Sequence, residues 1–146
     1  MKKVLNILII VTLLTTVSCD NDDSVVELNP NSVTDCSLSY TVDLDQYFVG
    51  ICLDGTNSAL PGETITYASK ATPNFTEIIW TVESGSMEVM GIVTSVENNV
   101  ENGRLKSIAT IRFNSDFSGG SLKAEAINND GEYAGMSLPV EVRNNQ

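Results

Sequence analysis

Histidine is absent from this sequence of 146 residues, and tryptophan occurs only once. Without histidine the sequence has no Ser-His-Asp or Cys-His catalytic system and no His-ligated zinc site. It has no phosphate-binding glycine loop either, because Gly119-Gly120 falls between two expected strands and not before a helix. Carboxylate pairs such as Glu83 and Glu88 are used by glycosidases, but an acidic chain contains many such pairs by composition alone. We therefore predict that the protein is not an enzyme.

No apolar run in the sequence is long enough to form a permanent transmembrane helix. The longest, Val4–Val17, has 14 residues, whereas a helix that crosses the hydrocarbon core needs about 20. Lys2 and Lys3 precede this run, and a small residue and Cys19 follow it. A positive end, a short apolar segment and a small residue before a cleavage point predict a secretory signal peptide over residues 1–18.

The end of the predicted signal peptide carries a motif for lipid attachment. Thr16-Val17-Ser18-Cys19 resembles a bacterial lipobox, in which the cysteine is lipidated and becomes the mature N-terminus. The next residues, Asp20-Asn21-Asp22-Asp23, resemble the acidic export signal of Bacteroidetes-type lipoproteins. The resemblance implies a lipid anchor on Cys19 and an outer-membrane location that faces the cell exterior. Enterobacterial sorting would instead retain such a lipoprotein at the inner membrane, and an ordinary signal peptide with a chance cysteine is the alternative to lipidation.

The chain that follows the signal peptide is poor in basic residues. The sequence contains 8 Lys and Arg against 19 Asp and Glu, and removal of residues 1–18 changes the formal charge to −13. Such an excess repels nucleic acid and anionic headgroups, so we expect no nucleic-acid partner and membrane attachment through the lipid alone. Residues 19–35 are polar and lack periodicity, which predicts a flexible acidic tether. Within it, Asp23-Ser24-Val25 resembles a Bacteroidetes-type O-glycosylation site at Ser24.

Two cysteines remain if Cys19 carries lipid, and we predict that they form a disulfide. Secretion places Cys36 and Cys52 in an oxidising compartment. If the chain between them forms two strands that turn about Leu44, Tyr40 lies opposite Phe48 and the two cysteines also lie opposite each other. Directly opposed residues have Cβ atoms about 4.5–5.5 Å apart, close to disulfide geometry. The bond would stabilise the fold by about 3 kcal/mol in the chain-entropy model. Two free buried thiols are the alternative.

Residues 36–146 read as one domain made of short strands. Ile78, Trp80 and Val82 occupy every second position of one segment and so share a side, and Ile111 and Phe113 share a side of another segment. We take these five residues as core, because period-2 alternation marks half-buried strands. About seven such segments, separated by Gly, Asn and Asp turn signals, predict an all-β antiparallel sandwich. Further alternating segments are 64–67, 87–89, 92–96, 122–127 and 138–142.

One segment resembles a known domain family. Trp80-Thr81-Val82-Glu83-Ser84-Gly85-Ser86 is similar to the Trp-Asp-Phe-Gly-Asp-Gly-Ser signature of PKD-type domains, which are immunoglobulin-like sandwiches. The Asn128–Gly131 turn and the alternating strand after it resemble the end of the same family. The resemblance keeps the packing residues Trp80, Val82 and Gly85 but replaces both signature aspartates. It implies a PKD-like sandwich, with Trp80 between the two sheets, that serves as an interaction or spacer unit.

The candidate recognition residues are aromatic side chains beside turns. Phe75, Phe117 and Tyr133 each adjoin a turn signal, and we expect them to form an exposed binding surface. We expect no cofactor. A calcium ion is the one alternative, because oxygen ligands are available from acidic residues, but their spacing does not match an EF-hand and solvated loop carboxylates are the favoured explanation. These acidic residues are Asp43, Asp45 and Asp54.

Together these features predict a non-catalytic, lipid-anchored binding or adhesion module at the cell surface, with a protein or glycan ligand. One alternative is a structural subunit of an outer-membrane or envelope complex, held by its partner through strand pairing or a sheet face. Another is a glycan-binding accessory protein of a polysaccharide-uptake system. The role given to PKD-like domains here is an analogy of fold and does not follow from any one residue.

Overall fold

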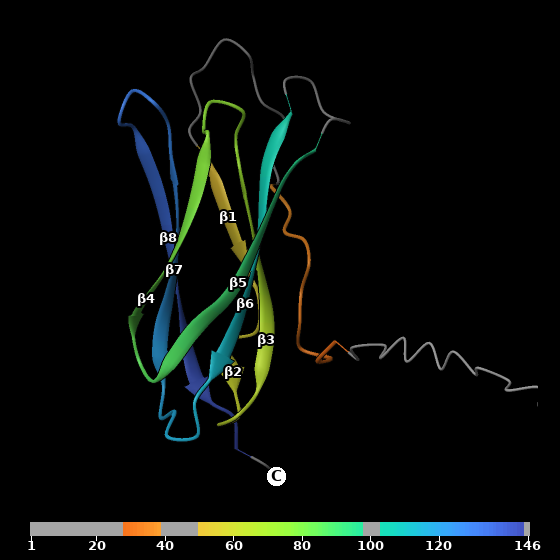
Figure 1. Ribbon diagram of the computed structural model, residues 1–146, viewed down its shortest axis with the longest axis vertical. Coiled ribbons are helices and arrows are strands. Elements are labelled where there is room, and N and C mark those ends of the chain that lie inside the picture. Colours follow the sequence, from red (N-terminus) through yellow and green to blue (C-terminus); the bar gives the residue numbers. More distant parts are fainter. Residues whose placement is uncertain (1–27, 39–49, 98–102, 145–146) are drawn as a thin grey trace, which may run out of the picture.

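The computed structural model describes residues 28–38, 50–97 and 103–144. Within these ranges the regular structure is entirely β, and the elements are eight strands (Figure 1). The strands are β1 (Ile51–Asp54), β2 (Ser58–Ala59), β3 (Thr64–Ala71), β4 (Glu77–Ser84), β5 (Met87–Glu97), β6 (Arg104–Phe113), β7 (Gly120–Ile127) and β8 (Tyr133–Val142).

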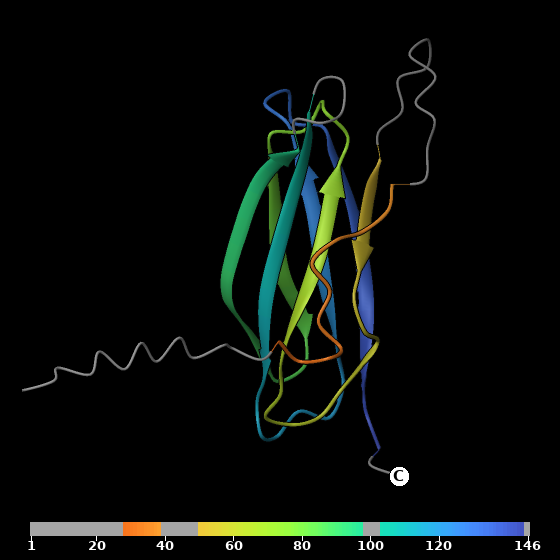
Figure 2. The same cartoon turned by 90° about the vertical axis from the view of Figure 1, so that its right-hand side faces the viewer.

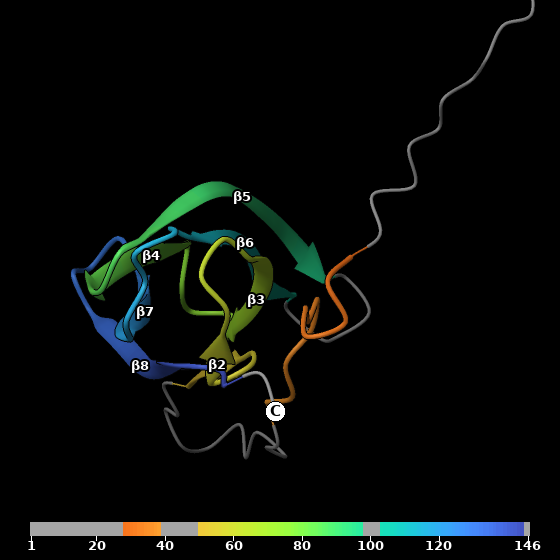
Figure 3. The ribbon, with the colours of Figure 1, turned by 90° about the horizontal axis from the view of Figure 1, so that it is seen from below.

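The strands form two sheets that pack face to face, which confirms the predicted β-sandwich. One sheet has the order β1-β3-β6-β5 and the other the order β2-β8-β7-β4 (Figures 1 and 3). All pairs are antiparallel except the short β2–β8 pair, which is parallel. The count is eight, where about seven strands were expected, because the chain between β1 and β3 crosses from one sheet to the other. Strands of four and two residues are too short to show an alternating pattern.

The core lies between the sheets and follows the alternation in the sequence. Successive side chains of a strand point to opposite faces, and in β6 and β7 every second residue is accordingly buried. Of the five residues expected in the core, four are buried and Val82 is partly buried against them. Trp80 is only 6% exposed, and its indole Nε1 donates a 2.9 Å hydrogen bond to Ser107 Oγ of the opposite sheet. This bond satisfies the polar atom that burial of a tryptophan would otherwise leave without a partner.

The tight turn between β4 and β5 depends on a glycine. Gly85 has a φ of 91°, a left-handed conformation that other residues adopt only with strain. An added Cβ atom would also lie 2.5 Å from the carbonyl oxygen of Gly119, so the turn packs directly on the connection between β6 and β7. Gly62, in the turn before β3, has a similar φ of 86° but open space around the position of a Cβ atom.

The N-terminal part of the described chain lies along the outside of β3 and not free of the domain (Figure 2). Val33 N donates to Thr66 O at 3.0 Å, and Thr66 Oγ1 donates to Val33 O at 2.8 Å. We call residues 28–38 the N-terminal strap. The prediction of a flexible tether through residue 35 is therefore wrong for residues 28–35. The polar side chains that suggested a solvated tether make specific hydrogen bonds to the sheet.

Candidate functional site

The aromatic residues chosen as a recognition surface are not brought together. Phe75 and Phe117 are buried, so the prediction that they are exposed is wrong. Phe117 packs edge-on against Phe113, with ring centroids 4.7 Å apart. Both residues lie in turns, and their rings pack into the core at the ends of the sandwich. The apolar space between two sheets must be filled there as well. Tyr133 alone is exposed, with 72% of its surface accessible.

Acidic residues do not form a catalytic or metal centre among the described residues. Glu83 accepts a hydrogen bond from Ser121 in one sheet, whereas Glu88 lies beside Arg112 in the other. In the described part of the chain no group of three or more Cys, Asp or Glu side chains lies close enough to hold a metal ion. Two of the three candidate calcium ligands, Asp43 and Asp45, lie outside the described residues. The third, Asp54, accepts a 2.8 Å hydrogen bond from the next backbone N–H.

The described residues also contain no helix of the length and apolarity that a membrane crossing requires. The predicted signal peptide, the lipidation residue Cys19, the export signal over residues 20–23 and Ser24 all lie outside the described residues.

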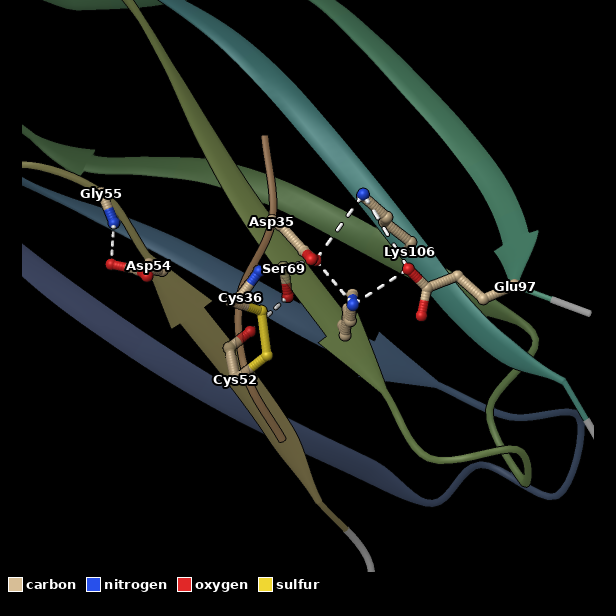
Figure 4. Close-up of a disulfide and its surroundings, with 9 residues drawn as sticks. Asp35, Cys36, Cys52, Asp54, Gly55, Ser69, Glu97 and Lys106 are labelled. Atoms are coloured by element: carbon tan, nitrogen blue, oxygen red, sulfur yellow. Dashed lines mark hydrogen bonds and ion pairs between the residues drawn. A yellow bond between two sulfur atoms is a disulfide. The ribbon is translucent and has the colours of Figure 1, made fainter. Parts of the chain in front are cut away.

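The disulfide predicted from the spacing is present. Cys36 and Cys52 are bonded, with their Cα atoms 6.2 Å apart (Figure 4). In the described residues, Cys36 and Cys52 are not cross-strand partners of a hairpin. Cys36 lies in the strap, outside any strand, and the strand of Cys52 pairs with β3. The expected pairing of Tyr40 with Phe48 lies outside the described residues. The bond therefore ties the strap to β1, an edge strand.

Next to the disulfide, a cluster of four charged residues joins the strap to the sheet (Figure 4). The Lys70 ammonium lies 2.6 Å from Asp35 of the strap and 2.9 Å from Glu97 of β5, and Lys106 lies beside the same two carboxylates. Burial of Lys70 acts to lower its pKa, but the bonds to Asp35 and Glu97 outweigh it and the pKa is raised. The largest effect on Asp35 is the hydrogen bond from Lys70, which lowers its pKa. Burial acts in the opposite direction but is weaker, so the pKa of Asp35 is lowered. Both partners are thus held in their charged forms.

Among the described residues, the largest group of exposed apolar side chains on one element lies on β5. We call Met90, Ile92, Val93 and Val96 the β5 edge, since within the described chain β5 has β6 as its single neighbour. Val93 is 67% exposed and Val96 is 56% exposed. Stable soluble proteins seldom leave a long apolar edge strand uncovered, because its unpaired backbone groups invite pairing with another chain.

The exposure of the β5 edge has a structural cause. A bulge between Val89 and Gly91 shifts the register with β6, so that Ile92 lies opposite Ala109 and Val96 opposite Leu105. Those two β6 residues are buried between the sheets, yet their partners on β5 are exposed. The last half of β5 therefore extends past the cover of the opposite sheet. Sequence reasoning expected a strand here and missed this surface, although the lack of any charge over residues 89–96 is a signal.

Comparison with known proteins identifies no relative: no family model, no curated protein and no solved structure matches this chain.

Proposed function

We propose that the protein is a non-catalytic, lipid-anchored binding module of a bacterial outer membrane, facing the cell exterior, and that its β5 edge binds a protein partner. The location follows from the signal peptide, the lipobox-like Cys19 and the acidic run after it. The binding role follows from the β5 edge, which is the single observation that carries the proposal. The lack of histidine in the sequence, and of any group of Cys, Asp or Glu side chains in the described residues that could hold a metal ion, supports a role without chemistry.

We further propose that the sandwich is immunoglobulin-like and close to the PKD type. In an immunoglobulin domain the sheets have the strand orders A-B-E-D and C-F-G. Numbered along the chain, β1-β3-β6-β5 and β4-β7-β8 follow these orders, with β2 added at the edge of the second sheet. Trp80 lies on β4, the strand that corresponds to C, where immunoglobulin domains carry their buried tryptophan. The Cys36–Cys52 bond departs from that pattern, because it joins the strap to β1 and does not bridge the sheets.

The chemistry of the β5 edge favours an extended polypeptide as the ligand. A strand that adds to a sheet edge gains backbone hydrogen bonds and packs alternate side chains on the sheet. The edge offers apolar side chains at Ile92 and Val96 on one side and at Val93 on the other, with no charge in between. An exposed aromatic ring can stack on a sugar, and of the three candidate rings only Tyr133 is exposed, which gives a glycan less support than a polypeptide.

Strand pairing is also the contact expected of a structural subunit in an outer-membrane complex, which is therefore the second candidate function. The two functions share the same surface and differ in how long the partner stays bound. A glycan-binding accessory protein is the third candidate, and a glycan array on the soluble domain tests it directly, since binding there would replace the protein partner in our proposal.

Photocrosslinking on intact cells tests the binding surface. A photoreactive amino acid at Val93 should give a discrete protein adduct. The same probe at Met136, which is exposed on β8 in the other sheet, is the matched control and should not. The change Val93→Lys places a charge in the edge and should abolish partner binding, whereas Met136→Lys should not. Adducts at Met136 or Tyr133 without one at Val93 would contradict the assignment.

A further inference from the structure

The N-terminal strap runs along β3 in the same direction as the strand. At its start, Asn29 Nδ2 donates to Glu63 Oε1 at 3.2 Å, just before β3 begins. Further on, Thr66 N donates to Ser32 Oγ at 3.0 Å. Near the other end of β3, Asp35 pairs with Lys70 at 2.6 Å. The strap therefore begins toward one end of the sandwich, the end where the chain leaves β8 (Figure 2).

We infer that the strap fixes which end of the sandwich faces the membrane: the end with the Leu60–Glu63 turn lies near the bilayer, and the end with the Asn128–Glu132 turn points away. The inference rests on the proposed lipid anchor at Cys19. It deepens the proposed function by orienting the binding surface.

The length of the connection decides between the two orientations. Nine residue steps separate Cys19 from Leu28, and a chain of that length spans at most about 30 Å. An inverted sandwich would raise Leu28 by at least the length of β3, which has eight residues and so measures about 26 Å, and by the height of the loops beyond it. The connection would then have to be almost fully extended at all times, which conformational entropy opposes.

The strap keeps the connection to the lipid short, because it attaches the chain to the sandwich only nine residues after Cys19. Without it, the first described residue bonded to the sandwich would be Gly50, which pairs with Thr72 and lies 31 steps from Cys19, and a chain of that length reaches about 100 Å. Either end could then face the bilayer. The Cys36–Cys52 bond keeps the strap attached permanently, while Asp35 and the backbone bonds to Thr66 set its direction.

The orientation has a consequence for the partner. Strand β5 runs antiparallel to β6 and therefore in the direction of β3, so it stands with Met87 toward the membrane and Glu97 toward the exterior. The partner strand must then run roughly along the membrane normal. A neighbouring outer-membrane protein with an upright extended segment or strand fits this geometry, and Tyr133 lies at the end that meets the exterior.

Energy transfer to the bilayer tests the inference. The full-length lipoprotein, labelled with a donor dye at Pro61→Cys or at Asp130→Cys, is reconstituted into phosphatidylethanolamine–phosphatidylglycerol vesicles that contain an acceptor-labelled lipid. Both positions are exposed and lie at opposite ends, and the native cysteines 36 and 52 are blocked by their bond. Transfer should be about twofold or more higher from position 61, because the strands between the ends are about 26–36 Å long.

Two variants separate the strap from the anchor. Replacing both Cys36 and Cys52 by Ala, together with Asp35→Ala, should reduce the difference between the two dye positions. A 20-residue Gly-Ser insertion after Ser24, outside the described residues, lengthens the connection to Cys19 and should lower transfer from position 61. Equal transfer from both positions, or more from position 130, in vesicle-bound protein overturns the orientation while the anchor stands. Failure of the protein to float with vesicles overturns the anchor and the inference together.

Discussion

Removal of the indole of Trp80 should destabilise the fold by several kcal/mol. A tryptophan side chain buries roughly 200 Å², which corresponds to about 5 kcal/mol at 25 cal/mol per Å². Trp80 is only 6% exposed, so nearly all of this area is buried. The neighbouring residues relax only partly into such a space, so Trp80→Ala should lower the free energy of unfolding by about 3–5 kcal/mol.

The structure separates packing from hydrogen bonding at this position. Trp80→Phe retains most of the apolar contact and loses only the bond from Nε1 to Ser107 Oγ, so it should cost less than Trp80→Ala. Ser107→Ala leaves the buried N–H group without its acceptor and should cost about 1–3 kcal/mol. The hydroxyl of Thr94, which lies 3.3 Å from Ser107 Oγ, keeps Ser107 paired in the Trp80 variants.

Urea unfolding followed by far-ultraviolet circular dichroism measures these differences, because the variants lack the single tryptophan that fluorescence would report. In the native wild type the tryptophan emission should be blue-shifted and should move to the red on unfolding. A cost below about 1 kcal/mol for Trp80→Ala, or a red emission maximum in the native protein, would refute burial between the sheets.

Three further predictions test the anchor, the turn and the strap. Labelled palmitate should be incorporated by the wild type and not by Cys19→Ala, and incorporation by the variant would disprove lipidation at that residue. Gly85→Ala should cost about 2–4 kcal/mol from strain and overlap, and Gly62→Ala only about 1 kcal/mol from strain; equal losses in urea unfolding would contradict the close packing of the first turn. The lowered pKa of Asp35 means that its bond to Lys70 contributes stability above the usual aspartate pKa and that this is lost as pH falls through the lowered value. Asp35→Asn should therefore flatten the fall in stability below about pH 4. Because the Asp35 side chain is 61% exposed, the substitution Asp35→Asn should change the free energy of unfolding at neutral pH by less than about 1 kcal/mol. An unchanged pH profile of stability would argue against the pairing of Asp35 with Lys70.

The sequence predicts the sandwich because its signal is local and repeated. Alternation of apolar residues, as in Ile78, Trp80 and Val82, directly sets which face of a strand is buried, and the turns carry their own Gly and Asn signals. The cysteine pair was also predictable, since Cys36 and Cys52 are the two cysteines that remain once Cys19 is assigned to the proposed lipid anchor. The hairpin offered as its cause was a guess about pairing partners, and such partners are set by tertiary packing.

What the sequence could not predict depends on contacts between distant segments. A turn position does not say whether a ring points outward, so Phe75 and Phe117 were misassigned. The strap is held by polar groups such as Asn29 and Ser32, which look the same in a solvated segment. The β5 edge carries an ordinary strand pattern, and the exposure of Ile92 and Val96, which lie opposite buried residues of β6, follows from the extent of the opposite sheet.

Display on the cell surface is the central claim, and protease added to intact cells tests it most directly. We predict that the external protease digests the wild-type protein, and that replacing Asp22 and Asp23 by Ala protects it while palmitate incorporation and the melting temperature stay nearly unchanged. The substitutions lie outside the described residues, in the polar segment before the strap, and surface changes usually alter stability by less than about 0.5 kcal/mol. A wild-type protein that resists protease on intact cells, yet is digested after lysis, would contradict surface display and leave the structural subunit of an envelope complex as the function.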